Sequence, residues 1–341
     1  MNEPIKHHFI PQFILRNFTN NEDRIFYWNK ESNQVETRNT KSVYMVKNLY
    51  RDEQNHPTDP AIIERKFAIL ESTIATLFRE KIMNKESIEL SRTENETLRK
   101  FLFLLSFRSS TRKQQYIDAN FDEMTKTSLD KYVSNGDYVD LWLREILTIL
   151  DLDNYTDIQD KEDVSWTIRT DFLLHLKSYY MTFVTPRGQD FILCDIYPTA
   201  EIYPVGFSGA NLYPHFLFPI SPNLMLLLNH IAFRPDVLPG LPMTNNMVAL
   251  SRIKGSAIIP PRPHYIVNGE INKEDLYTYK VQKIYSEDVV YLNALMLNET
   301  RHGFSFRDVS RIGHSVKRYQ TNEKTKAHNK NDYSEFLNNI E

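Results

Sequence analysis

The sequence predicts an α+β protein in which a mostly helical body packs on a central antiparallel sheet, with the N-terminal segment buried in the core. Three observations predict this class. Apolar residues recur at three- and four-residue steps through about residues 59–180. Short β-branched and aromatic runs separated by proline- and glycine-containing turns fill about residues 180–230. Residues 6–18 are rich in bulky apolar side chains, whereas a frayed terminus is polar.

Composition indicates a globular protein of ordinary type. The chain has 341 residues, of which 41% are hydrophobic and 25% charged, and its net charge of −3 gives no global reason to expect nucleic acid. A single cysteine excludes an internal disulfide. No apolar run reaches the roughly 18 residues of a membrane span, and the start of the chain lacks a signal-peptide pattern. We therefore expect a soluble, cytoplasmic protein without a membrane partner.

The elements before residue 135 follow from local patterns. Residues 24–29 and 43–46 predict a small hairpin or extended segments. Asp59-Pro60 is a strong helix start, and the helix after it carries a core-facing stripe made of Ile63, Phe67, Leu70, Ile74, Leu77 and Phe78. Thr93 and Glu96 have the spacing of a capping box, which starts a second helix with Leu98, Phe101, Leu102 and Leu105 on one face.

The second stripe ends at two charged residues. Arg108 and Arg112 occupy positions where the helical period calls for apolar groups, and Tyr116 continues the same face. Two interpretations stay open. The arginines either reach solvent or pair with buried acids, or they line a cleft for an anion such as phosphate.

The rest of the chain changes character near residue 180. Helices are predicted around residues 138–150 and 166–180, followed by a hairpin of residues 180–185 and 190–194 with a four-residue turn, and a second hairpin of residues 215–218 and 224–228. A C-terminal helical part spans about residues 243–310, with a weak helix at 243–253 and a clearer one capped by Ser286. We expect one domain over residues 1–314 and a mobile polar tail over 315–341.

The opening motif carries a family resemblance. His8, Pro11-Gln12 and Leu15-Arg16-Asn17-Phe18 resemble the start of the bacterial proteins grouped as domain of unknown function 4238. In that family a strand ends in Ser-Asp closely followed by proline, which is similar to Cys194-Asp195 and Pro198 here, with cysteine for serine and one extra residue before the proline. Residues 218–222 resemble a family turn and Asn293 a family asparagine, so the resemblance spans most of residues 6–300.

The resemblance implies a bacterial protein and a candidate site. Members occur among genes on mobile elements that protect cells against phage. His8 beside Asp195 would give an oriented imidazole able to act as a general base, and Arg108 would stabilise developing charge, which makes these three the candidate catalytic residues. For Asp195, capping of a neighbouring helix or turn is an equal alternative. Candidate substrate-binding residues are Gln12, Arg16, Arg112 and Asn293.

Three hypotheses follow. The first is an intracellular anti-phage defence effector, best described as a metal-independent nuclease acting on RNA or DNA. The second is a non-enzymatic sensor that recognises a phage protein or nucleotide in the same cleft, and the third is an interaction module whose arginines only form ion pairs. The sequence has no phosphate-binding glycine loop, dinucleotide fingerprint or zinc spacing, so we expect no cofactor and no metal. The expected partner is nucleic acid or a phage component, and the oligomeric state stays open.

Overall fold

The chain forms two compact units whose segments alternate along the sequence. The structure is a computed structural model that describes residues 6–20, 22–153, 155–197, 199–200, 203–205, 210–212, 215–230, 275–321, 332–338 and 340. The first unit comprises residues 1–11, 44–80 and 92–178, and the second comprises residues 12–43, 81–91 and 179–341. We predicted one domain over residues 1–314. Each of the two units is instead assembled from three separate stretches of the chain. Helices and several antiparallel sheets together make the predicted α+β class.

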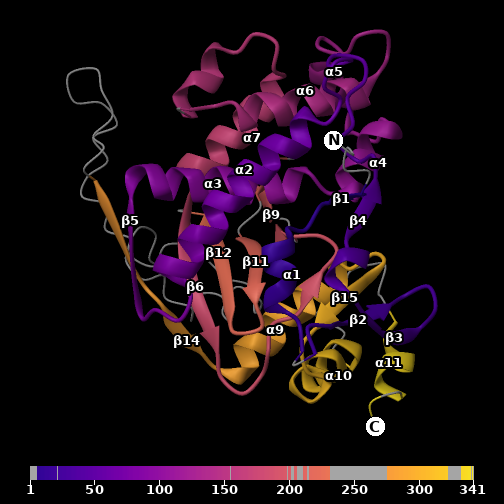
Figure 1. Cartoon of the computed structure of the whole chain (residues 1–341), viewed down its shortest axis with the longest axis vertical. Coiled ribbons are helices and arrows are strands. Elements are labelled where there is room, and N and C mark those ends of the chain that lie inside the picture. The colour runs from indigo at the N-terminus through magenta and orange to yellow at the C-terminus, as the bar shows by residue number, and fades with distance from the viewer. Residues whose placement is uncertain are drawn as a thin grey trace. The chain divides into compact units, whose positions relative to one another are not determined.

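The first unit is mainly helical. In the part of this unit that the structure describes, one strand pair joins β1 (Lys6–His8) to β4 (Met45–Lys47) in antiparallel register. The helices, labelled in Figure 1, are α2 (Ile62–Leu77), α3 (Arg92–Phe107), α4 (Ser110–Ile117), α5 (Glu123–Leu129), α6 (Tyr138–Leu150) and α7 (Trp166–Lys177), and a 3₁₀ turn covers Tyr155–Asp160. The stripe predicted for residues 63–78 is buried, as its helical spacing requires.

The helical stripe through Arg108 is interrupted. We predicted one continuous face from Thr93 to Tyr116, but α3 ends at Phe107 and α4 starts at Ser110. Ser109 is the cause, because its hydroxyl accepts a hydrogen bond from the backbone N–H of Arg112 at 3.1 Å and so caps the new helix. Arg108 therefore sits at a break between two helices rather than within one.

The second unit holds most of the sheet structure. A five-stranded sheet has the order β14-β6-β12-β11-β8, and a four-stranded sheet the order β3-β2-β15-β7. Their strands are β14 (Gln282–Ile284), β6 (Tyr179–Pro186), β12 (Leu224–His230), β11 (His215–Ser221) and β8 (Thr199–Ala200), then β3 (Gln34–Arg38), β2 (Ile25–Asn29), β15 (Gly303–Phe306) and β7 (Leu193–Cys194). All pairs are antiparallel except β14 with β6.

Two smaller sheets and four helices complete the described part of this unit. β13 (Leu276–Lys280) pairs with β5 (Ser87–Ser91), and β10 (Ala210–Leu212) pairs with β9 (Tyr203–Val205). The helices are α1 (Gln12–Asn17), α9 (Ser286–Glu299), α10 (Gly313–Thr321) and α11 (Ser334–Asn338), with 3₁₀ turns at Thr40–Ser42 and Val309–Arg311. Buried side chains of β7, β12, β15 and α9–α11 form one apolar core.

One predicted hairpin is correct and one is wrong. β11 and β12 pair across the predicted turn. β6 and β7 do not pair: β6 lies between β12 and β14, while β7 joins β15. Phe191 is buried and its backbone N–H donates to the carbonyl of Pro222, so tertiary contacts hold this stretch away from β6. A short turn between two strands does not decide that they pair with each other when each of them can pair with another strand in the core.

The predicted polar tail contains structure. The residues of α10 and α11 bury Val316, Tyr319, Tyr333 and Phe336 in the core of the second unit. Lysine and asparagine dominate the composition there, but these few apolar side chains decide the packing. The weak helix predicted at 243–253 lies outside the described residues.

Candidate functional site

The two adjacent histidines of the opening motif lie on β1 and have different environments. His7 is buried, its ring stacks on that of Tyr50 with 5.6 Å between centroids, and its Nδ1 accepts the backbone N–H of Tyr50 at 3.0 Å. His8 is only half-buried. Alternation along a strand points the two side chains to opposite sides. His8 is therefore the more exposed of the two side chains, although its Nε2 is buried.

Arg108 is tied to the same strand. Its Nε donates to the carbonyl oxygen of Phe9 at 3.1 Å, and one Nη donates to that of His8 at 3.2 Å. The other Nη lies 2.7 Å from a carboxylate oxygen of Glu71, and the guanidinium stands 4.4 Å from the ring centroid of Phe67. Only 1% of Arg108 is exposed. The arginine thus fixes the backbone of the motif that carries His8.

Two carboxylates of α2 surround this guanidinium. Glu64 and Glu71 are half-buried and lie seven residues apart, which places both on one side of the helix. Burial raises the pKa of Glu64 to about 7, opposed by Arg108 and assisted by the charge of Glu71. Tyr50 also contacts Arg108, because its hydroxyl donates a hydrogen bond to the backbone carbonyl of Arg108 at 2.6 Å.

We call His7, His8, Tyr50, Glu64, Glu71 and Arg108 the Arg108 cluster. Its chemistry is that of proton transfer. A carboxyl group with a pKa of about 7 is present in both protonation states near neutral pH, and histidine is the side chain that most often transfers protons in catalysis. The cluster can therefore supply a general acid and a general base.

The two predicted arginines take different roles. Arg108 forms an ion pair with Glu71, which agrees with the interpretation that the arginines pair with acids. Arg112, on α4, donates to the side-chain oxygen of Gln115 at 2.8 Å, and its guanidinium stands 5.2 Å from the ring centroid of Phe107. Its charge also acts on the buried carboxyl of Glu145. The structure does not place the two guanidiniums on one ligand.

Asp195 belongs to the second unit. It follows β7, and its carboxylate accepts the backbone N–H groups of Arg301 at 3.1 Å and His302 at 2.5 Å. These two amides lie in the turn between α9 and β15, so Asp195 caps that turn, as the alternative for this residue anticipated. Burial raises its pKa, and the two amide hydrogen bonds oppose that shift.

The remaining predicted residues also lie in the second unit. Gln12 exchanges two hydrogen bonds with Thr40, at 3.0 and 3.1 Å, and Arg16 is exposed near the end of α1. Asn293 is fully buried: its oxygen accepts from the backbone of Ile192 at 3.2 Å, and its amide donates to Asp190 at 2.8 Å and Ser315 at 3.0 Å. That the residues of both units serve one reaction stays a prediction.

Sequence reasoning missed the two glutamates and Tyr50. Glu64 and Glu71 border the apolar stripe of α2 at a seven-residue spacing, which is the signal that could have found them. Among the described residues, no three histidine, cysteine, aspartate or glutamate side chains gather as a metal site would require. Within the same residues, no helix combines the length and apolarity needed to cross a bilayer.

Comparison with known proteins identifies a family. No curated protein and no solved structure matches the chain. A family model described as protein of unknown function (DUF4238) matches residues 6–309, which include β1, α2, the break at Arg108, and Asn293. That match covers most of the 341 residues and agrees with the resemblance carried by the opening motif. The chain is therefore a member of the DUF4238 family.

Proposed function

We propose that this protein is a cytoplasmic bacterial anti-phage defence effector that cleaves nucleic acid without a metal ion, using the Arg108 cluster. The observation that carries the proposal is one buried guanidinium, Arg108, which holds the backbone of the family-motif residue His8 and acts on Glu64, a carboxyl group whose pKa is about 7. Acid–base catalysis is most efficient when the pKa of the catalytic group lies near the working pH.

The proposed reaction on RNA uses both groups. His8 takes the proton of a ribose 2′-hydroxyl, the 2′-oxygen attacks the adjacent phosphorus, and Glu64 gives its proton to the departing 5′-oxygen. The products are a 2′,3′-cyclic phosphate and a free 5′-hydroxyl. On DNA, which lacks that hydroxyl, a water molecule is the nucleophile instead. Arg108 acts as a positioning residue, because its N–H groups already hold His8, Phe9 and Glu71.

The test is cleavage of end-labelled single-stranded RNA and DNA by purified protein in EDTA. We expect cleavage that falls at least about 100-fold in His8→Ala, the range that general acid–base groups contribute. His314, an exposed histidine on α10, supplies the matched control His314→Ala, which should cleave normally. Thermal melting must show that His8→Ala is folded. Equal cleavage by the two variants, or none by the parent protein under any ionic condition, contradicts the proposal.

One observation favours the sensor alternative. Arg108 is 1% exposed and bonded on three sides within the protein, so it offers no cation to a phosphate. A sensor for a phage protein or nucleotide needs no oxyanion stabilisation. It predicts no cleavage, but a rise in melting temperature when the ligand binds the folded state.

A further inference from the structure

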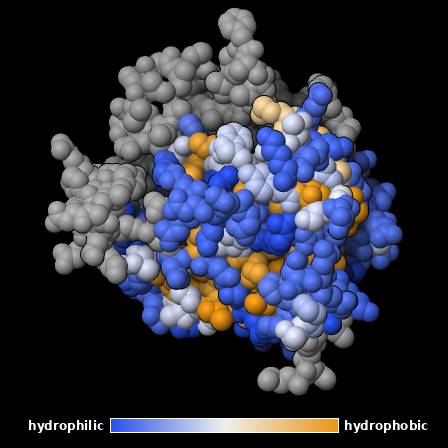
Figure 2. All heavy atoms as spheres, turned by 90° about the horizontal axis from the view of Figure 1, so that it is seen from above, coloured by the Kyte–Doolittle hydropathy of each residue, from blue (hydrophilic) through white to orange (hydrophobic). Residues whose placement is uncertain are grey.

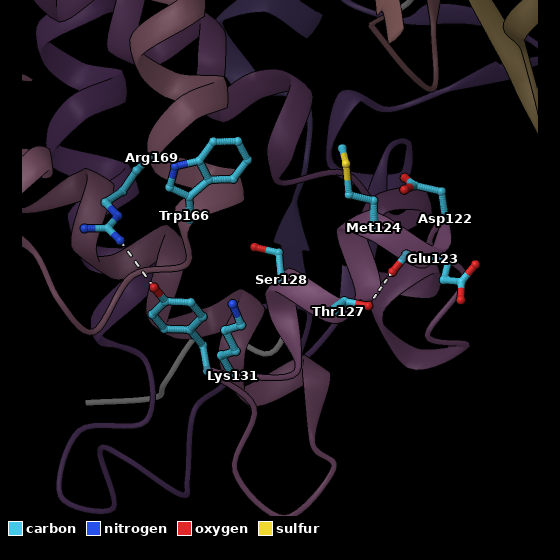
Figure 3. A pocket seen from close by; sticks show the side chains of 9 residues that line it. Asp122, Glu123, Met124, Thr127, Ser128, Lys131, Trp166 and Arg169 are labelled. Atoms are coloured by element: carbon cyan, nitrogen blue, oxygen red, sulfur yellow. Dashed lines mark hydrogen bonds between the residues drawn. The ribbon is translucent and has the colours of Figure 1, made fainter. Parts of the chain in front are cut away.

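A groove opens between α5 and the start of α7 in the first unit, away from the residues used above. Its volume is about 960 Å³. Its lining is mixed and includes Asp122, Glu123, Met124, Lys131, Trp166 and Arg169. Figure 3 shows Trp166 and Arg169, both from α7, on one wall and Met124 of α5 on the other, with Ser128 and Lys131 between them. We call this the α5–α7 groove.

The two walls carry exposed apolar side chains. Trp166 is 58% exposed and Met124 is 77% exposed. The face seen from above in Figure 2 is largely hydrophilic, with hydrophobic side chains breaking through in places. Single exposed apolar residues need no explanation, but here an exposed indole and an exposed thioether line the same groove, and the face of an indole is a platform for a flat ring.

The basic and acidic side chains of the groove lie at opposite ends. Lys131 and Arg169 lie with Trp166, whereas Asp122 and Glu123 lie beside Met124 (Figure 3). One Nη of Arg169 donates to the hydroxyl of Tyr132 at 3.2 Å and the other to the backbone carbonyl of Gln159 at 3.3 Å. These bonds fix the guanidinium at this wall, where the half-buried side chain contributes its positive charge. The first turn of α7 contains no acidic residue, so its N-terminal dipole adds positive potential at Trp166. An anion is favoured at the tryptophan end and repelled at the other.

We propose that the α5–α7 groove binds a phosphorylated nucleotide, either free or as one unit of a single strand. The base stacks on Trp166, and the phosphate is directed to Lys131 and Arg169, away from Asp122 and Glu123. Stacking platforms combined with basic side chains are the usual means of binding unpaired nucleotides. The proposal does not depend on the reaction proposed above, because it uses other residues and a binding assay.

Fluorescence can observe this groove selectively. The chain has three tryptophans, and Trp28 and Trp142 are fully buried, so the quenchable emission comes from Trp166. Adenosine, AMP and a hexaadenylate strand are titrated against the full chain. We expect saturable quenching by AMP and the strand, with adenosine binding several-fold more weakly because it lacks phosphate. Much tighter binding of hexaadenylate than of AMP identifies a strand as the ligand, and equal binding identifies a mononucleotide.

Variants locate the binding. Isothermal titration of Trp166→Ala should show an affinity loss of about 5- to 100-fold, the range of one base stack, and Lys131→Gln a smaller loss that shrinks at high salt. Lys126→Gln, an exposed lysine on α5 outside the lining, is the matched control and should bind normally. Absence of binding up to about 1 mM ligand, or equal affinity of Trp166→Ala and the parent protein, overturns the proposal.

Discussion

Glu71 and Arg108 form an ion pair of 2.7 Å in which the arginine is fully buried and the carboxylate half-buried. The same guanidinium holds two backbone carbonyls of the N-terminal segment, so one side chain links α2 to the residues of the family motif. The stability of the first unit should depend on this link.

Arg108→Met should destabilise the first unit by about 3–5 kcal/mol, because it leaves a carboxylate and two carbonyl oxygens without their donor. Urea unfolding measures the change. Arg79→Met, at an exposed position of the same unit, is the control and should shift the unfolding free energy by less than about 0.5 kcal/mol. Similar effects of the two substitutions would show that the link carries no stability.

The proposed role of Glu64 makes cleavage depend on pH. As a general acid, Glu64 must be protonated, and burial raises its pKa to about 7. The cleavage rate should therefore fall as pH rises through about 7, with one proton lost per active molecule. Glu64→Gln should lose most of the cleavage activity, and the activity that remains should no longer fall as pH rises through about 7. An alkaline limb that persists in Glu64→Gln would assign it to another group.

Glu145 should make folding less favourable at high pH. This buried carboxyl accepts the hydroxyls of Tyr116 and Ser165, and burial raises its pKa from 4.5 to about 7. The folded state then binds more protons than the unfolded state between these values. The stabilisation is complete below pH 4.5 and is lost as pH rises through about 7.

Glu145→Gln tests that sign. The difference in unfolding free energy between variant and parent should grow in the variant's favour from pH 5 to pH 8, by up to about 3 kcal/mol. Comparing the two proteins at each pH cancels the opposing contribution of His175, whose pKa burial lowers to about 3. Glu31→Gln, at an exposed position, should give a flat difference. A flat difference for Glu145→Gln as well would refute the assignment.

Gly303 should not tolerate a side chain. A methyl group there would overlap the carbonyl oxygen of Trp28 on β2, and that strand cannot move away without breaking its pairing with β15. We expect Gly303→Ala to cost about 3 kcal/mol or more, measured by thermal melting. Gly313→Ala should cost much less, because the described atom that such a methyl group would meet, at 3.1 Å, is the flexible end of the Ile340 side chain.

Local patterns determined much of this fold. The apolar stripe of α2 and the β11–β12 hairpin follow from periodicity and turn residues, which act over a few neighbours. The helix predicted from Ser286 also forms, but Tyr285 rather than Ser286 is its N-cap, and Asp288 accepts the backbone N–H of Tyr285. The opening motif also identified the family, and its apolar residues Ile10, Ile14, Leu15 and Phe18 are buried.

Tertiary structure decided the partners. β7 pairs with β15 rather than with β6, and Tyr333 and Phe336 bury their rings in the core although the stretch around them is polar. The same holds for chemistry, because Asn293, Asp195 and Arg108 are held by backbone groups that are distant in sequence. Sequence spacing reports which side chains share a face of one element. Which buried polar group satisfies another depends on contacts between elements, and only the folded chain brings these together.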